Sequence, residues 1–223
     1  NLLKSPIEKY THILHIADCH IRLNKRHDEY REVFNNLYEE IKKTPETTAV
    51  AFLGDIFHSK SELSPECVQM ATDLFKAIAD IRPLILVAGN HDATLSNKSR
   101  LDSLTPLVDS LAHPNVFYLK TTGLYGFGNI LFNNMCVFDQ PERYIQAETI
   151  PDIYRNQYEH IIAMFHGAMD KASLETGYAI SNPAIMPPLF DYNDMALLGD
   201  IHNKQDMQDY DPDNHKPCIH YVG

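Results

Sequence analysis

Short apolar runs that end abruptly in polar residues recur along this chain. Five such runs cover residues 13–17, 49–53, 84–88, 161–165 and 195–198. Each is too short for a helix and suits a strand that is buried on both faces. The third run, LILVA, lies between Pro83 and Gly89, and Gly89 lets the backbone turn sharply. We therefore predict buried strands whose carboxyl ends carry polar side chains.

Longer stretches between the first runs have the periodicity of amphipathic helices. Residues 28–43 place apolar side chains three and four positions apart. A second helix is predicted to start at Pro65 with Ser64 as its N-cap, and a third to cover residues 105–112. Strands that alternate with helices predict a parallel sheet covered by helices. The polar ends of all five runs would then meet at one edge of the sheet.

The apolar runs beyond Pro114 are shorter and more interrupted. Residues 116–119, 130–132 and 135–138 predict antiparallel hairpins of a second sheet, with Asn133 and Asn134 as a break. The remaining segments predict a loop with a short helix over 140–160, a loop over 172–188 and a final strand over 218–222. We find no internal repeat or linker, so residues 1–223 form one predicted domain.

Composition narrows the class of protein. With 44% hydrophobic residues the chain can bury a core, and no apolar run approaches the roughly 20 residues of a membrane helix, so we expect no membrane contact. The net charge of −11 confines any nucleic-acid contact to one face, because binding phosphates needs local Lys and Arg. The chain starts at Asn1 and stops at Gly223, and we expect it to be truncated at its C-terminus.

The four cysteines show no CxxC spacing, which disfavours a zinc knuckle or a redox motif. We therefore expect reduced thiols and a cytoplasmic, reducing location. Cys19 lies between two donor-type residues, but in an extended segment its side chain should point to the opposite face. We predict that Cys19 packs in the core.

Donor-type side chains directly follow the five apolar runs. They are Asp18, His20, Asp55, Asn90, His166, Asp200 and His202. Seven donors exceed the needs of one tetrahedral metal and suit two metal ions that share a bridging ligand. Without metals the three carboxylates would repel one another. Ordinary turn residues could explain one such motif, but the recurrence after five strands favours a two-metal site.

Five short motifs carry a resemblance to a known family. They are Asp18-x-His20, Gly54-Asp55-x-x-His58, Gly89-Asn90-His91-Asp92, His166-Gly167 and Gly199-Asp200-x-His202. In this order, over nearly the whole chain, they resemble the calcineurin-like metallophosphoesterases. The resemblance implies an α/β fold in which two mixed sheets form a sandwich flanked by helices (αββα). The segments GDIFH, VAGNHD and LLGDIHNKQ look most like the SbcD-type DNA repair nuclease subunit.

The resemblance also implies a role for each motif residue. Asp18, His20 and His202 would bind the first metal, Asn90 and His166 the second, and Asp55 would bridge them. His91 would contact the scissile phosphate and protonate the leaving oxygen, Asp92 would orient its imidazole, and His58 would help to position the phosphate. The family usually has His where this chain has Asp200. We expect Asp200 to remain a ligand and its oxygen to favour Mn²⁺, with Mg²⁺ as the alternative.

The resemblance leaves three functions open. The first is a DNA exonuclease or endonuclease of double-strand-break repair or recombination, which the resemblance implies would work with an SbcC-type ATPase subunit and as a homodimer. The second is a small-molecule phosphatase or cyclic-nucleotide phosphodiesterase, and the third a non-catalytic scaffold, which would require lost donors. Basic residues that follow the motifs favour a polyanionic substrate such as DNA. They are Arg22, Lys25, Arg26, Lys60, Lys98, Arg100, Lys171 and Lys204.

Overall fold

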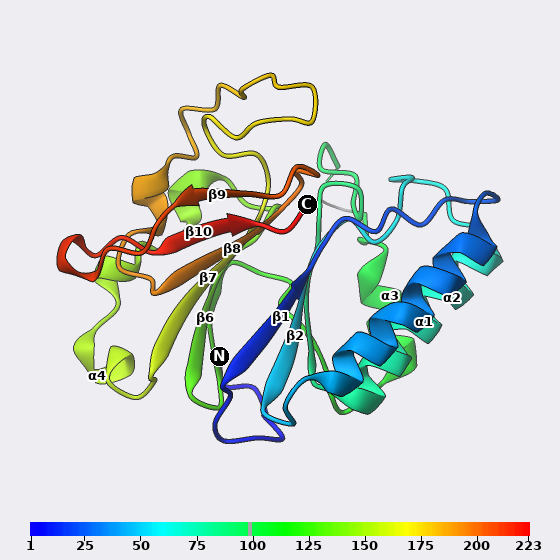
Figure 1. Ribbon diagram of the computed structural model, residues 1–223, viewed down its shortest axis with the longest axis horizontal. Helices are drawn as coiled ribbons and strands as arrows, with labels where there is room; N and C mark the ends of the chain where they lie inside the picture. Colours follow the sequence, from blue (N-terminus) through cyan, green and yellow to red (C-terminus); the bar gives the residue numbers. More distant parts are fainter. Residues whose placement is uncertain (98–99) are drawn as a thin grey trace.

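Two β-sheets packed face to face form the centre of the computed structural model, which describes residues 1–97 and 100–223 (Figure 1). The first sheet has the order β1-β2-β3-β4 and is parallel at each pair. Its strands are β1 (His12–Ile16), β2 (Thr48–Leu53), β3 (Leu84–Val87) and β4 (Val116–Tyr118). Crossover helices join the first three strands, as parallel neighbours require.

The second sheet has six strands in the order β5-β6-β7-β8-β10-β9. Its strands are β5 (Gly123–Phe127), β6 (Ile130–Met135), β7 (His160–His166), β8 (Met195–Gly199), β9 (Gln205–Gln208) and β10 (Cys218–Tyr221). The β5–β6 and β9–β10 pairs are antiparallel and the others parallel, so this sheet is mixed. The predicted α/β sandwich of two sheets is confirmed.

Three helices cover the outer face of the first sheet (Figure 1). They are α1 (His27–Lys43), α2 (Pro65–Ile81) and α3 (Leu104–Leu111). The Ser64 hydroxyl accepts the Cys67 N–H at 3.3 Å, which confirms the predicted N-cap of α2. The other sheet is covered more thinly. The elements there are α4 (Asp152–Arg155) and 3₁₀ turns at Pro141–Arg143, Ala147–Thr149, Pro187–Phe190 and Pro212–Asn214.

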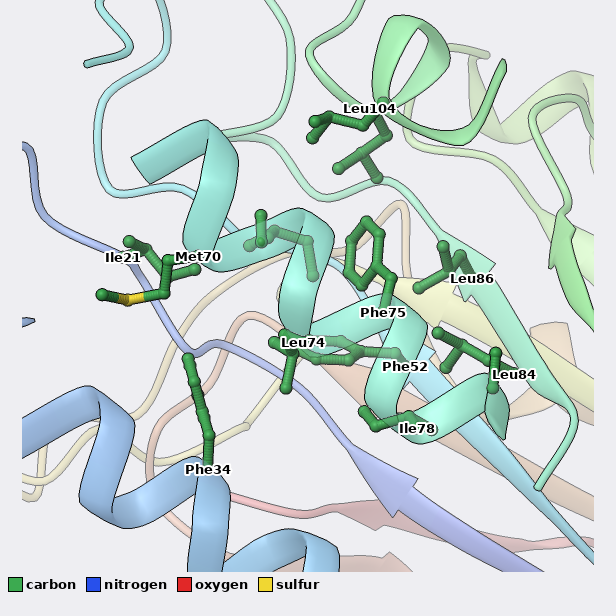
Figure 2. Packing of buried hydrophobic residues seen from close by; sticks show 14 of the residues in the cluster. Ile21, Phe34, Phe52, Met70, Leu74, Phe75, Ile78, Leu84, Leu86 and Leu104 are labelled. Carbon is green, nitrogen blue, oxygen red and sulfur yellow. The ribbon is translucent and has the colours of Figure 1, made fainter. Parts of the chain in front are cut away.

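The alternation of side chains along β2 and β3 divides the core into layers. Phe52 points to the helices and packs edge-on against Phe75 of α2, with ring centroids 6.4 Å apart (Figure 2). Leu53 and Ile85 point the other way, into the layer between the sheets. Each fully buried Leu, Ile or Phe contributes about 1.5–3 kcal/mol. Because both faces of β2 and β3 are buried, the ends of these strands have a fixed position.

Several details of the predicted second half were wrong. Residues 116–119 do not form a hairpin, because β4 continues the first sheet in parallel with β3. Asn133 and Asn134 do not break the chain but lie inside β6. Their side-chain N–H groups find acceptors outside the strand: Asn134 Nδ2 donates to the carbonyls of Leu119 and Thr121, both at 2.8 Å. Buried asparagines can therefore occupy a strand when neighbouring loops supply acceptors.

The third helix also starts earlier than predicted. It begins at Leu104, because the Asp102 carboxylate accepts the N–H groups of Leu104 and Thr105 at 3.1 and 2.8 Å.

None of the helices in the described residues is both long and apolar enough to cross a membrane.

Candidate metal centre

The carboxyl ends of five strands meet where the two sheets join. β1, β2 and β3 come from the first sheet, whereas β7 and β8 come from the second, so the prediction of a single sheet edge was wrong. Hydrogen bonds link the two sets of ends. The Asp200 N–H donates to both oxygens of Asp18 at 3.0 and 3.1 Å, and Asn90 Nδ2 donates to Asp200 Oδ1 at 2.7 Å. The site is therefore assembled from both sheets.

Four of the predicted donors have a left-handed backbone. The φ angles of Asp18, His20, Asp55 and Asp200 are 56°, 46°, 54° and 92°. Such conformations cost a non-glycine residue of order 1–3 kcal/mol each and persist only where the surroundings enforce them. Their concentration at these strand ends indicates that the fold holds these side chains in place at the expense of stability.

Two glycines allow the strand ends to approach closely. Gly54 has a φ of 81°, and a Cβ there would lie 2.6 Å from His166 Nδ1. A Cβ on Gly89 would lie 2.1 Å from Asp55 Oδ1. The missing side chains leave room for His166 and Asp55 to occupy the centre of the site.

The donor atoms form three overlapping groups. They are Asp18–His20–His202, His20–Asp55–His91 and Asp18–Asp55–His166, and in each group the atoms lie within 4.8 Å of one another. Asp18, His20 and Asp55 each belong to two groups, and Asp55 lies 3.5 Å from His20 Nε2 through Oδ2 and 3.3 Å from His166 Nε2 through Oδ1, as a bridging ligand would. Asp200 lies beside them, with Oδ1 3.8 Å from His166 Nε2. The structure thus brings together all seven predicted donors, Asn90 being held through Asp200.

The state of His166 shows that these residues fit a cation. Its Nδ1 donates to the Leu53 carbonyl at 2.6 Å, which leaves Nε2 as the coordinating nitrogen. Nε2 is buried and lies 3.3 Å from Asp55 Oδ1, without the geometry of a hydrogen bond. His20 Nε2 and His202 Nε2 face each other at 3.1 Å. Nitrogens and oxygens that converge in this way are well suited to divalent metals.

The pKa values describe the charge of the centre without metal. Burial lowers the pKa of His166, but Asp55, followed by Asp18 and Asp200, outweighs it and raises the pKa to about 9. Burial raises the pKa of Asp18 to about 6 and lowers that of His20 to about 4. For Asp55 burial is outweighed by the His166 contact, the His91 N–H and His20, so its pKa is lowered. His166 therefore carries the proton that a metal ion would replace.

A cavity of about 430 Å³ opens over these donors. His91 and His58 line it, and their ring centroids lie 5.0 and 5.8 Å from that of His20. The predicted role of Asp92 was wrong, because its buried carboxylate accepts the N–H groups of Ile56, Phe57 and Gly89. Instead, His91 Nδ1 donates to the His58 carbonyl at 2.7 Å. That carbonyl orients the His91 ring, and Asp92 braces the turn.

Three residues of the cavity wall lie outside the predicted donor and catalytic set, and of these Tyr30 was not expected near the site. Arg22 and Arg26 come from the segment after β1, and Tyr30 from the start of α1. The Tyr30 side chain packs against the core, and its hydroxyl donates to the His20 carbonyl at 2.6 Å. The short sequence distance of Tyr30 from the Asp18-x-His20 motif was the available signal.

Most of the basic residues predicted around the site do not line the cavity. Within the part of the chain that the structure describes, only Arg22 and Arg26 of that set belong to its wall. Lys98 lies outside the described residues. Cys19 packs in the core as predicted, with its thiol donating to the Ile56 carbonyl at 3.3 Å. The basic surface beside the donors is therefore narrow.

The fold and the donor set define a class of protein. The calcineurin-like phosphoesterase family matches residues 11–204, and this chain belongs to it. Members of this family are metal-dependent phosphoesterases that typically bind two divalent ions. The chain is also similar to the "Uncharacterized protein R555" of Acanthamoeba polyphaga mimivirus, with 38% identity over 205 residues. That match covers 89% of this chain and 15% of the viral protein, so the chain spans a small part of its relative.

Proposed function

We propose that this chain is a two-metal phosphodiesterase that cleaves DNA as an exonuclease or endonuclease in double-strand-break repair or recombination. The observation that carries the proposal is the convergence of the seven donors beneath an open cavity that holds two more histidines and two arginines. The donors match phosphoester hydrolysis, and the arginines favour an anionic substrate that extends beyond the scissile group.

The donors divide into two sets. Asp18, His20 and His202 would hold one ion and Asn90, His166 and Asp200 the other, with Asp55 between them. Two bound divalent ions would lower the pKa of a water molecule and offset the charge of the phosphoryl oxygens. The carboxylate of Asp200, where the family usually has His, favours Mn²⁺ and then Mg²⁺.

His91 is placed to move the proton. Because a carbonyl can only accept, the His58 carbonyl keeps a proton on His91 Nδ1. The other nitrogen, Nε2, then donates its proton to the leaving oxygen as the P–O bond breaks, and the ring passes from imidazolium to neutral imidazole. His58 itself lines the cavity and can contact a phosphate oxygen.

One observation favours the second candidate, a phosphatase or cyclic-nucleotide phosphodiesterase. The chain has a net charge of −11, and acidic surface repels a long polyanion. A small phosphate ester needs only the cavity and is less affected.

One set of assays separates the two functions. The purified chain, freed of metal and reloaded with Mn²⁺ or Mg²⁺, is incubated with labelled single-stranded and blunt-ended DNA, bis(p-nitrophenyl) phosphate, p-nitrophenyl phosphate and 2′,3′-cyclic AMP. We expect Mn²⁺ to support cleavage of DNA and of the diester. Turnover of the monoester or of the cyclic nucleotide with intact DNA would instead identify the second candidate.

Two partners belong to the same proposal. An SbcC-type ATPase subunit would supply ATP-dependent access to DNA, and a second copy of the chain could form a homodimer; light scattering of the chain alone and with such a subunit tests both. A reducing intracellular location is also proposed, and the four free cysteines support it.

A further inference from the structure

One wall of the cavity has a chemistry that the metal donors do not use. Arg22, Arg26 and Tyr30 form it, and the carboxylates of Asp18 and Asp55 line the same cavity. Cationic side chains beside a phosphoester site can bind an anionic group of the substrate other than the scissile phosphate. The contacts of each residue show which cation is available.

The backbone of Arg22 is held firmly. Ile21 before it is 1% exposed and forms a β-bridge with Phe57. The Arg22 carbonyl accepts from His27 Nε2 at 2.6 Å and from the Cys67 thiol at 3.2 Å. The Arg22 side chain therefore leaves from a fixed point two residues beyond His20, so ordering it on a ligand costs little backbone entropy.

Tyr30 positions the same wall. Its hydroxyl donates to the His20 carbonyl at 2.6 Å, and Tyr30 lines the same cavity as Arg22. The phenol is thus tied to a predicted metal donor and belongs to the same lining as Arg22. A guanidinium has five N–H donors that it can offer to a ligand in the cavity.

The two arginines differ in their ion pairs. Arg26 donates through Nε and Nη2 to the Glu29 carboxylate at 2.7 and 2.5 Å, which balances its charge. Arg22 forms no salt bridge with a carboxylate within the described parts of the chain, 1–97 and 100–223. Arg22 is therefore the cation of this wall whose charge is left for a substrate.

We propose that Arg22 binds the phosphate next to the scissile phosphate and so selects a strand with successive phosphodiesters over an isolated diester. This inference rests on the proposed function and names the part of the substrate that the site recognises. A planar guanidinium can give two parallel N–H···O bonds to one phosphate, which fixes the register of the strand over the donors.

The smallest matched substrates are the thymidine dinucleotide TpT, with one phosphate, and the trinucleotide TpTpT, with two. The wild-type chain loaded with Mn²⁺ should have a KM for TpTpT roughly 10- to 100-fold below that for TpT, the range expected of a charge-assisted bond. In Arg22→Ala this ratio should fall to near one, through KM rather than kcat, and Arg22→Lys should restore part of it. Lys25→Ala is the control, because Lys25 is exposed on the same loop and does not line the cavity.

The outcomes separate the inference from the function beneath it. A wild-type chain that cleaves both substrates without a preference, or an Arg22→Ala ratio equal to that of the wild type, overturns the role of Arg22 only. An equal loss of kcat on both substrates also overturns it, because Arg22 would then position catalytic groups. Hydrolysis of monoesters with neither TpT nor TpTpT cleaved overturns the proposed function and the inference with it.

Discussion

Replacing Gly89 with alanine tests whether the close approach of the strand ends holds the site together. The new Cβ would lie 2.1 Å from Asp55 Oδ1 and 2.3 Å from Asp55 N. Real Cβ contacts are essentially never shorter than 3.0 Å, so the new Cβ must move away from Oδ1 by roughly 0.9 Å and from the main-chain N by roughly 0.7 Å. One of them is a main-chain atom, so rotation of the Asp55 side chain alone cannot relieve the contact.

The magnitude follows from two separate effects. Overpacking costs about 1–3 kcal/mol, and the lower entropy of the unfolded alanine chain returns about 0.4–1 kcal/mol, so a net loss of roughly 1–2 kcal/mol is expected. A displacement of about 1 Å in a catalytic group can cost ~100-fold in rate. Gly89→Ala should therefore lose far more activity than its stability alone explains.

The assay measures urea unfolding without metal and diester turnover with Mn²⁺, under conditions where circular dichroism shows the variant folded. Gly177→Ala is the matched control. A Cβ there meets nothing within 4 Å, but the φ of 80° at Gly177 costs an alanine about 1–2 kcal/mol, from which the same entropy term of about 0.4–1 kcal/mol is subtracted. We expect Gly89→Ala and Gly177→Ala to lose stability to a similar extent. Only Gly89→Ala should also lose activity. Wild-type turnover in Gly89→Ala would refute the argument that this approach places Asp55.

Three further predictions concern protons. His91→Ala should lower turnover by roughly 10²- to 10⁴-fold while metal analysis still finds both ions; loss of an ion would make His91 a ligand instead. Because the pKa of His166 is raised to about 9, metal binding at pH 7.5 should release about one proton, and the metal affinity should fall as the pH is lowered. Calorimetry in buffers of different ionisation enthalpy measures the released proton. A binding enthalpy that is the same in all buffers would contradict this prediction. Burial, followed by His220, lowers the pKa of His15 to about 3. Below pH 6.5 the unfolded chain then binds more protons than the folded chain, so the free energy of unfolding decreases as the pH is lowered, by about 2 kcal/mol at pH 5. His15→Leu should remove that part of the pH dependence measured by urea unfolding. The same pH dependence in the variant and the wild type would contradict this prediction.

The donor residues could be found from the sequence because each follows an apolar run directly. A buried strand leaves little freedom for the residues at its end, so Asp18, Asp55 and His166 could be assigned to one site before any coordinates. The division of these residues between two sheets could not be predicted, since a run such as IIAMF has the same pattern in either sheet.

Backbone partners were also beyond the reach of the sequence. Asp92 was expected to orient His91 because the two are neighbours, but the carboxylate lies on three N–H groups of the turns, and the His58 carbonyl takes its place. A carbonyl has no residue type, so no pattern of side chains reveals it. For the same reason the side-chain acceptors of Asn133 and Asn134 could be assigned only from the structure.

The hydrogen bond from His166 to the Leu53 carbonyl has a consequence for how the molecule is assembled. Among the described strands, β1–β4 of the first sheet precede β5–β10 of the second, so the chain crosses from one sheet to the other between β4 and β5, and each half holds an incomplete set of donors. Neither half alone can form the metal site. Phosphoester hydrolysis is therefore a measure of whether the two halves have packed together correctly. If the chain were divided within that connection, activity would return only when the two fragments were combined. Bound metal ions would then stabilise the complex, because their ligands come from both fragments.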